Sequence, residues 1–577
     1  MSNRFFNEEL SRLKEQGAEF AYAYPSLAPR LGGPMTNPDV ERFLEGVAFQ
    51  TAMVRRKLED DFPEIVNDLV RLVLPHYLRP VPATTIVAFT PKPSLRQSVS
   101  IPAGTQLSAV PVDGTSCRFS TATDVEVHPL ELLDAIIVQP SGKDPEIKLT
   151  LSLTGLTLSQ WRPKSLRLFL SGEYISAADL YYLLNRRVKK ILLTPDGGGI
   201  PSQLPGDCLR PVGFADDESL LPYPQHAFPG FRLLQEYFSF PEKFLFFDLV
   251  GWERWRDRGE GTRFNLTLQL DSPNLGPLQI QRESFTLFAV PAINAFPHEA
   301  DPIYLDHRST RYLVRPTGPK PDHYQILSVD RVTGFKRNGA EERTYTPFEL
   351  FSSASRSVPV YHTSLQESPV RRAFDVSITT TYPDGSQPPE NETLSIDLTC
   401  TNGALPENLH RGDISLPTAA LPESVSFRNI TSINPELSSP LDPDLLWKLT
   451  SHLSLNYQSL ENAANLRSLL ELYVFPNRRG RAVATANLKR IDGIEEVTQR
   501  PGDCLVKGVM MRGLDIRIKV RQDHFAGPGD LYLFGCVLNH FLGGYASINT
   551  FTRLTIDDCL KGDCYQWPER LGAHPLL

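Results

Sequence analysis

The sequence predicts a multidomain α+β protein that is β-rich, with an N-terminal helical bundle segment, β-sandwich-like middle domains and a small C-terminal α/β domain. Apolar residues recur at helical spacing up to residue 74, alternate at strand spacing from residue 84, and return to helical spacing at 441–473. The 49 prolines among 577 residues favour short strands and turns over long helices. Because a domain holds about 150 residues, we expect roughly three or four domains.

The predicted boundaries follow the changes in spacing. Residues 1–83 are expected to be a helical assembly segment, and residues 84–310 a β-rich domain. Residues 311–440 are expected to form a second β-rich domain. Residues 441–577 are expected to combine a helical hairpin with the α/β domain.

Three short amphipathic helices are predicted in the first segment, over residues 4–23, from Asn37 to residue 58, and over 63–74. Asn37 can cap the second helix, and Pro38 suits its first turn. The second helix carries more apolar surface than one neighbouring helix requires. We therefore predict that a partner chain packs against the apolar residues of the first two helices, Phe6, Leu10, Leu13, Val40, Phe43, Leu44, Val47, Phe49 and Val54.

The middle of the chain shows short runs with a period of two, cut by Pro, Gly and Asp. The predicted strands are 86–89, 147–153, 166–170, 244–249, 264–270, 285–290 and 376–381. A small helix is predicted at 178–185. Seven aromatic residues fall between Gly230 and Asp248, a density that suits either a domain core or an interface, with core favoured.

The C-terminal unit is predicted to contain a helix at 531–547 and a strand at 550–556. Phe534, Phe541 and Tyr545 lie on the inward stripe of this helix. We predict that the unit docks a second copy of the same chain, and these three residues complete the set of predicted partner-binding residues.

Composition excludes several classes of protein. The net charge of −8 argues against a broad nucleic-acid-binding surface. Seven scattered cysteines form no disulfide framework, which fits a reducing compartment. The first residues contain no apolar signal-peptide region, and no stretch reaches about 18 continuous apolar residues. We therefore expect a cytoplasmic protein without direct membrane insertion.

Two groups of potential metal ligands lack the usual spacing. His298 and Asp301 lie near His307, but zinc-binding helices place two histidines four residues apart. Cys559 and Cys564 have acidic neighbours and no second cysteine pair. Local roles within the fold are favoured for both groups, so the prediction is that the chain has no metal site.

Other motifs are equally unspecific. Residues 196–199, Asp-Gly-Gly-Gly, lack the Lys-Ser/Thr of a phosphate-binding loop and favour a hairpin turn. The basic run at 478–481 is typical of a solvated loop. No Gly-x-Ser-x-Gly nucleophile motif is present. We predict no catalytic residue and no cofactor.

Several short sequence segments, in the same order along the chain, are similar to segments of the TssF family, also called VasA or ImpG. The matching segments lie at 6–10, 17–21, 40–49, 74–80, 238–244, 293–296, 300–303, 398–406, 453–457, 533–541 and 545–551. Residues 510–513 and 542–544 differ from those of typical members.

The resemblance implies a structural subunit of the type VI secretion system baseplate. Two copies would join one TssG to form a wedge, and wedges would connect to TssK, TssE, the sheath and the spike protein VgrG. The family has no known enzymatic activity or cofactor. Its members would work in the cytoplasm, docked through the membrane complex at the inner membrane.

Two alternatives from other classes stay open on the residues alone. A β-rich hydrolase could use the loop from His298 to His307, which would require a convergent polar pocket with shifted pKa values. A carbohydrate-binding β-sandwich would require a concave face lined by aromatic side chains.

Overall fold

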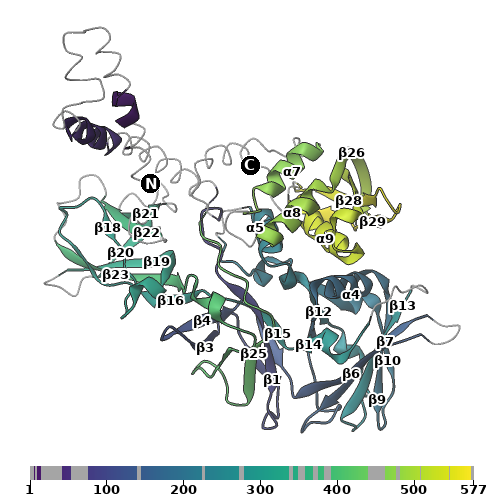
Figure 1. Cartoon of the computed structure of the whole chain (residues 1–577). Helices are drawn as coiled ribbons and strands as arrows, with labels where there is room; N and C mark the ends of the chain where they lie inside the picture. The colour runs from purple at the N-terminus through teal and green to yellow at the C-terminus, as the bar shows by residue number, and fades with distance from the viewer. Residues whose placement is uncertain are drawn as a thin grey trace.

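Figure 1 shows the computed structural model of the chain. It describes residues 6, 10–14, 42–53, 74, 76–139, 144–223, 228–271, 279–336, 342–348, 358–367, 374–382, 391–439, 462–475, 481–506, 508–544, 546 and 548–572. Strands outnumber helices in these ranges, so the prediction of a β-rich α+β protein is confirmed in this coarse sense.

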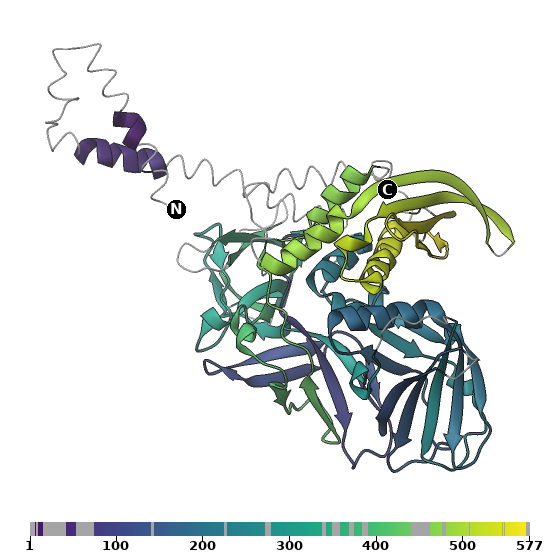
Figure 2. The ribbon, with the colours of Figure 1, turned by 45° about the vertical axis from the view of Figure 1, so that its right-hand side comes forward.

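Residues 10–14 and 42–53 are helical. They lie within two of the helices predicted for the N-terminal segment, and both views show the purple helices apart from the sheets (Figures 1 and 2). Of the third predicted helix only Leu74 is described, and it is not helical.

A six-stranded antiparallel sheet lies at the centre of the chain. Its strands, in spatial order, are β24 (Ile414–Leu416), β3 (Gln106–Val112), β4 (Thr115–Thr121), β15 (Ala289–Ile293), β1 (Thr84–Pro91) and β25 (Val425–Asn429). The first six residues of β1 are all buried, as expected for a strand covered on both faces. Because β24 and β25 pair with β3 and β1, the segment predicted as 311–440 returns to the sheet that the segment 84–310 begins.

Two further sheets lie beside it. The five-stranded one has the order β10 (Ser202–Pro205), β9 (Val188–Asp196), β13 (Arg263–Leu270), β7 (Glu146–Leu153) and β6 (Leu130–Val138). The four-stranded one has the order β11 (Leu209–Val212), β12 (Phe246–Leu249), β8 (Leu166–Leu170) and β14 (Phe285–Leu287). Strand β7 buries every second residue, which confirms the period-two prediction at 147–153.

The predicted strand at 285–290 is wrong as a single element. Phe288 has a φ of 54°, and this left-handed residue separates β14 from β15. The resulting bend lets one apolar run supply strands to two different sheets. Alternation along a sequence does not reveal such a bend.

Two helices connect these sheets to the C-terminal unit. Helix α4 (Tyr174–Arg187) contacts β8, β9 and β11, and it extends the helix predicted at 178–185. Helix α5 (Pro229–Ser239) begins with a proline in its first turn and is buried from Gly230 to Ser239.

An eight-stranded sheet is inserted between β15 and β24. It follows the path β16 (Phe296–Glu299), β23 (Glu392–Thr401), β19 (Gln325–Lys336), β20 (Glu342–Pro347), β21 (Val360–Glu367), β22 (Phe374–Thr381) and β18 (Tyr312–Leu313), with β17 (Ile303–Leu305) paired to β23. Its buried apolar residues form a core separate from the main one.

The C-terminal unit begins with α7 (Ala463–Glu471) and α8 (Arg481–Asp492). Its sheet consists of β26 (Ile494–Val506), β27 (Val509–Val520), β28 (Thr550–Asp558), β29 (Cys564–Gln566) and β30 (Arg570–Leu571). Strands β27 and β28 are parallel and are joined through α9 (Pro528–Gly544), as parallel strands require a crossover. Both the predicted helix at 531–547 and the strand at 550–556 are confirmed in position, whereas α8 and the long hairpin were not predicted.

The remaining elements are short. Strands β2 (Val99–Ile101) and β5 (Val125–Val127) form a two-stranded sheet. Single-turn 3-10 helices lie at Gly206–Cys208, Asp216–Glu218, Pro241–Phe244, Trp252–Arg254, Arg282–Ser284, Pro321–His323, Leu405–Asn408 and Gln522–His524. Within the described ranges, no helix has both the length and the apolar character needed to cross a bilayer.

Candidate functional site

The helix at 42–53 carries apolar side chains on two faces. The covered face consists of two buried alanines and two half-buried aliphatic residues, Ala48, Ala52, Leu44 and Val47. The other face leaves Phe43 70% exposed, Phe49 51% and Met53 58%. At 3.6 residues per turn, these three side chains fall within about one third of the helix circumference. The exposed face is therefore a continuous apolar strip.

Gly46 lies in the middle of this strip. A Cβ atom added at Gly46 would meet nothing within 4 Å, so the surface beside it is open. A glycine at such a position lets another backbone approach closely. The strip formed by Phe43, Phe49 and Met53 around Gly46 is called the exposed helix face below.

The other residues predicted to bind a partner through the N-terminal segment are less accessible or are not described. Phe6, Leu10 and Leu13 are half-buried. Val40 and Val54 lie outside the described residues. Sequence reasoning missed Met53, although its position ten residues after Phe43 returns it to the same helical face.

Helix α9 has its predicted aromatic stripe inside the chain. Phe534 and Phe541 are both 0% exposed. The ring centroid of Phe541 lies 5.9 Å from that of Phe231, and that of Phe534 lies 5.8 Å from that of Tyr237. In the described chain these two phenylalanines therefore pack against α5, and they do not reach the surface. Tyr545 lies outside the described residues.

The aromatic segment at 230–248 belongs to the core, which confirms the favoured interpretation. All seven aromatic residues are at most 9% exposed, namely Phe231, Tyr237, Phe238, Phe240, Phe244, Phe246 and Phe247. Because all of these rings are buried in the core, packing within the chain is enough to explain why so many aromatic residues occur in this segment.

A buried ion pair fastens the loop before α5 to this core. The Glu236 carboxylate is 0% exposed and accepts hydrogen bonds from the backbone N–H groups of Leu220 at 2.7 Å and Leu221 at 3.0 Å. Lys243 Nζ donates to the same carboxylate. Burial lowers the pKa of Lys243, and the Glu236 charge opposes this effect. Because the Glu236 carboxylate and the Lys243 ammonium group are both bonded within the chain, we interpret this ion pair as a stabilising contact of the fold.

A second polar cluster joins the C-terminal unit to α4. Asp530, 1% exposed, accepts hydrogen bonds from Tyr174 Oη at 2.8 Å, Arg490 Nε at 2.9 Å and the Ala526 N–H at 3.0 Å. Burial raises the pKa of Tyr174 well above its usual value. The tyrosine therefore stays protonated and serves as a hydrogen-bond donor.

The structure does not bring together the potential metal ligands His298 and His307. His298 stacks on Tyr324 at 4.6 Å between ring centroids, and its Nε2 lies 2.7 Å from the Thr317 carbonyl oxygen. His307 packs against Tyr382 instead, at 5.7 Å. The described ranges contain no group of three or more His, Cys, Asp or Glu side chains placed to hold a metal ion.

The hairpin turn predicted at residues 196–199 is confirmed. Asp196 is the last residue of β9, and Gly197 to Gly199 follow it in the hairpin that β9 forms with β10. Gly197, Gly198 and Gly199 all have φ values between 93° and 102°, a region that glycine adopts freely.

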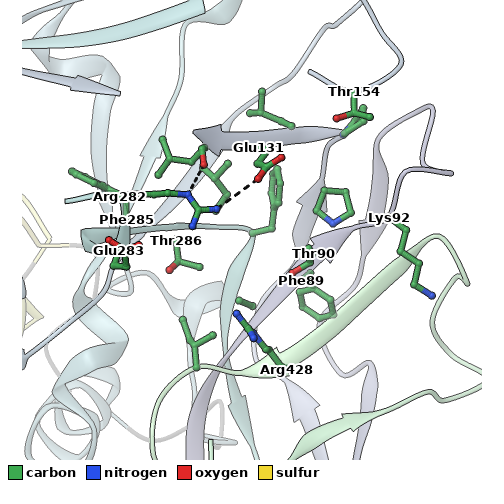
Figure 3. A pocket seen from close by; sticks show the side chains of 18 of the residues that line it. Phe89, Thr90, Lys92, Glu131, Thr154, Arg282, Glu283, Phe285, Thr286 and Arg428 are labelled. Atoms are coloured by element: carbon green, nitrogen blue, oxygen red, sulfur yellow. Dashed lines mark hydrogen bonds and ion pairs between the residues drawn. The ribbon is translucent and has the colours of Figure 1, made fainter. Parts of the chain in front are cut away.

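A pocket of about 460 Å³ lies where β1, β6, β14 and β25 meet (Figure 3). Arg282 Nε donates to the Leu132 carbonyl oxygen at 2.9 Å, and Arg282 Nη2 lies 3.7 Å from Glu131. The described lining contains no histidine, cysteine or serine, so it offers no pairing of such a nucleophile with a histidine base. Sequence reasoning missed the pocket because its walls come from segments up to about 340 residues apart.

The family described as "Type VI secretion system, TssF" matches residues 2–574. This chain belongs to the TssF family. A curated relative, type VI secretion system component TssF1 of Pseudomonas aeruginosa strain PAO1, is 30% identical over an alignment of 628 positions that covers 99% of each chain.

Solved structures also resemble this TssF-family chain over most of its length. A chain in the cryo-electron microscopy structure of the type VI secretion system TssK-TssF-TssG baseplate subcomplex matches with a TM-score of 0.76 and 30% identity. The match covers 92% of this chain and 99% of that one. A chain of the baseplate complex from the type VI secretion system matches with a TM-score of 0.67 and 26% identity over 100% of both chains.

Proposed function

We propose that this chain is a structural, non-catalytic subunit of a type VI secretion system baseplate, assembled with TssG and TssK. The observation that carries the proposal is the match to a chain of the TssK-TssF-TssG subcomplex over 92% of this sequence. A match of this extent includes the sheets, the inserted sheet and the C-terminal unit together. The function therefore rests on the whole architecture and not on one motif.

The exposed helix face is the surface proposed to contact TssG. Phe43, Phe49 and Met53 present the large apolar side chains that protein interfaces favour, and Gly46 leaves room for a partner helix. The face opposite, with Leu44 and Val47, is already half-covered within this chain. The two faces would let one helix pack on its own segment and on TssG at once.

The remaining partners are proposed from the family resemblance. Two copies of this chain would join one TssG, and the wedge would connect to TssE, the sheath and the spike protein VgrG. The assembly would lie in the cytoplasm, docked at the inner membrane through the membrane complex. Native mass spectrometry of the complex purified from coexpressing cells measures the ratio of this chain to TssG. A ratio of one to one would contradict the proposed two copies per TssG.

The test of the TssG surface is a double variant, Phe43→Ser/Met53→Ser, coexpressed with TssG and TssK. Both side chains are more than half exposed, so the chain should fold normally while binding to TssG weakens about tenfold or more. Ile175→Ser is the matched control, because Ile175 is 48% exposed on α4. Affinity is measured by titration of the purified chains.

A third variant separates the two faces of the helix. Leu44→Glu places a carboxylate on the half-covered face, where burial of an unpaired charge is costly. It should disturb the N-terminal segment itself and so abolish TssG binding, while the melting of the sheets stays unchanged. Normal TssG recovery with both Leu44→Glu and the double variant would refute the proposed surface.

A further inference from the structure

The hairpin of β26 and β27 extends beyond the rest of its sheet. Parallel pairing of β27 with β28 extends only from Arg512 to Val520. Pairing within the hairpin continues to Val506 and Val509. Residues 504–511 therefore form a two-stranded ribbon beyond the sheet, about 13 Å long at 3.3 Å per residue. In Figure 2 the yellow-green hairpin curves away from the rest of the chain.

This ribbon, called the arm below, is apolar on both faces. Leu505 and Met510 lie opposite each other on one face and are 65% and 67% exposed. Val509, 62% exposed, lies on the other face, where Cys504 pairs with Met511. A two-stranded ribbon is only marginally stable by itself in water. An apolar, exposed ribbon that is otherwise unsupported is best explained by a binding partner.

We propose that the arm inserts into an apolar slot on a different protein subunit of the same assembly. A slot contacts both faces of a ribbon, whereas a flat surface covers one. Its walls can also pair with the outer edge of β26, which forms hydrogen bonds only to β27 among the described strands. The thioethers of Met510 and Met511 suit such a pocket, because methionine adapts its shape. The inference rests on the proposed function, since the slot belongs to another baseplate subunit.

Contact between the tips of two copies would be too small. A ribbon of two strands, about 13 Å by 10 Å, offers at most a few hundred Å² per copy, whereas a stable interface buries about 800 Å² per partner. Such a contact would also leave one apolar face in water. A slot on a larger subunit covers more of the arm and adds contacts around its mouth.

A lipid bilayer fits the arm less well. Along the arm, the outer edges of both strands pair with no other described strand, and free N–H and C=O groups find no partner in hydrocarbon. Asp503 and Arg512 are charged residues at the base of the arm, where Arg512 Nε lies 3.9 Å from Asp503 Oδ1. Insertion of the arm would bring these charges to the lipid tails.

The test uses the full chain in the complex with TssG and TssK. A photo-crosslinker introduced by Met510→benzoylphenylalanine is activated in the assembled complex, and the linked peptides are identified by mass spectrometry. We expect a crosslink to apolar residues of one other subunit. The same substitution at Ile200, which is 65% exposed in the turn between β9 and β10, is the matched control.

A substitution measures the contribution of the arm. Leu505→Ser/Met510→Ser should keep the melting temperature of the free chain and weaken binding to the crosslinked subunit about tenfold. Crosslinks only to a second copy of this chain, or no crosslink at all, would overturn the slot. Binding of the unsubstituted chain, but not of the double variant, to vesicles of phosphatidylethanolamine and phosphatidylglycerol would overturn it as well. If the unsubstituted chain fails to assemble with TssG and TssK, the proposed function fails as well, and the two failures are thus distinguishable.

Discussion

Two buried asparagines hold the ends of the inserted sheet together. Asn294 Nδ2 donates to Asn402 Oδ1 at 2.9 Å and to the Arg118 carbonyl oxygen at 2.6 Å. The Asn402 backbone N–H donates to Asn294 Oδ1 at 2.7 Å. Asn294 is 0% exposed and Asn402 is 2% exposed, so water cannot replace these bonds. Both residues belong to sequence segments that resemble the TssF family.

Asn294→Ala should destabilise the chain by about 1–3 kcal/mol. The substitution leaves the buried Asn402 N–H without its acceptor and also removes the bond to the Arg118 carbonyl. An unsatisfied buried polar group carries its full desolvation cost. Thermal and urea unfolding of purified protein measure the change. Asn391→Ala is the control, since Asn391 makes its bond to Tyr304 at the surface. Equal losses for both variants would contradict the role of the buried pair.

At the scale of elements, α9 holds the C-terminal unit to the rest of the chain. It contacts α4, α5 and β28, and most of its length is buried. Its start approaches α4 closely, because a Cβ added at Gly529 would lie 2.3 Å from the backbone carbonyl carbon of Ala178. Glycine at this position is therefore required by the packing of two helix backbones.

Gly529→Ala should separate α9 from α4 and lower stability by about 1–3 kcal/mol, the usual range for overpacking. Limited proteolysis should then release fragments of the C-terminal unit at lower protease concentration. Gly46→Ala is the contrast, because nothing lies within 4 Å of the added methyl group. Unchanged proteolysis and melting for Gly529→Ala would show that the helices can shift at little cost.

At the scale of the whole molecule, the chain leaves its central sheet and returns to it. Strand β1 pairs with β15 on one side and with β25 on the other, and the eight-stranded sheet lies between these two partners in the sequence. The inserted sheet has its own core. The eight-stranded sheet is therefore an insertion, and its two ends lie next to each other at Asn294 and Asn402.

Replacement of residues 296–400 by a short Gly/Ser linker should leave the remaining sheets folded. The ends to be joined lie side by side, and the core of the insertion is separate from the main core. Circular dichroism, gel filtration and thermal melting of the shortened chain measure this outcome. Truncation after residue 413 should instead cause aggregation, because it removes β25 from the edge of β1 and also removes the C-terminal unit that covers α4 and α5. A soluble, folded truncation would contradict the proposed closure of the sheet.

Local patterns predicted several elements well, for a physical reason. Strand β7 alternates because its side chains must bury one face, whatever covers it. Helix α9 is apolar along most of its length because nearly all of it is buried. The aromatic segment at 230–248 is buried for a similar reason, because its large apolar side chains must be covered. The bend at Phe288 and the long hairpin were missed, since neither changes the apolar spacing in a recognisable manner.

The sequence by itself determined the periods of its elements, the family, and the apolar character of the helix around Phe43. Only the tertiary structure decided which strands share a sheet, because a period of two says that a face is buried but not which strand lies beside it. It also decided that Phe534 and Phe541 are internal, whereas Phe43, Phe49 and Met53 are exposed. Exposure depends on contacts between residues far apart in the chain, and such contacts leave no local signal.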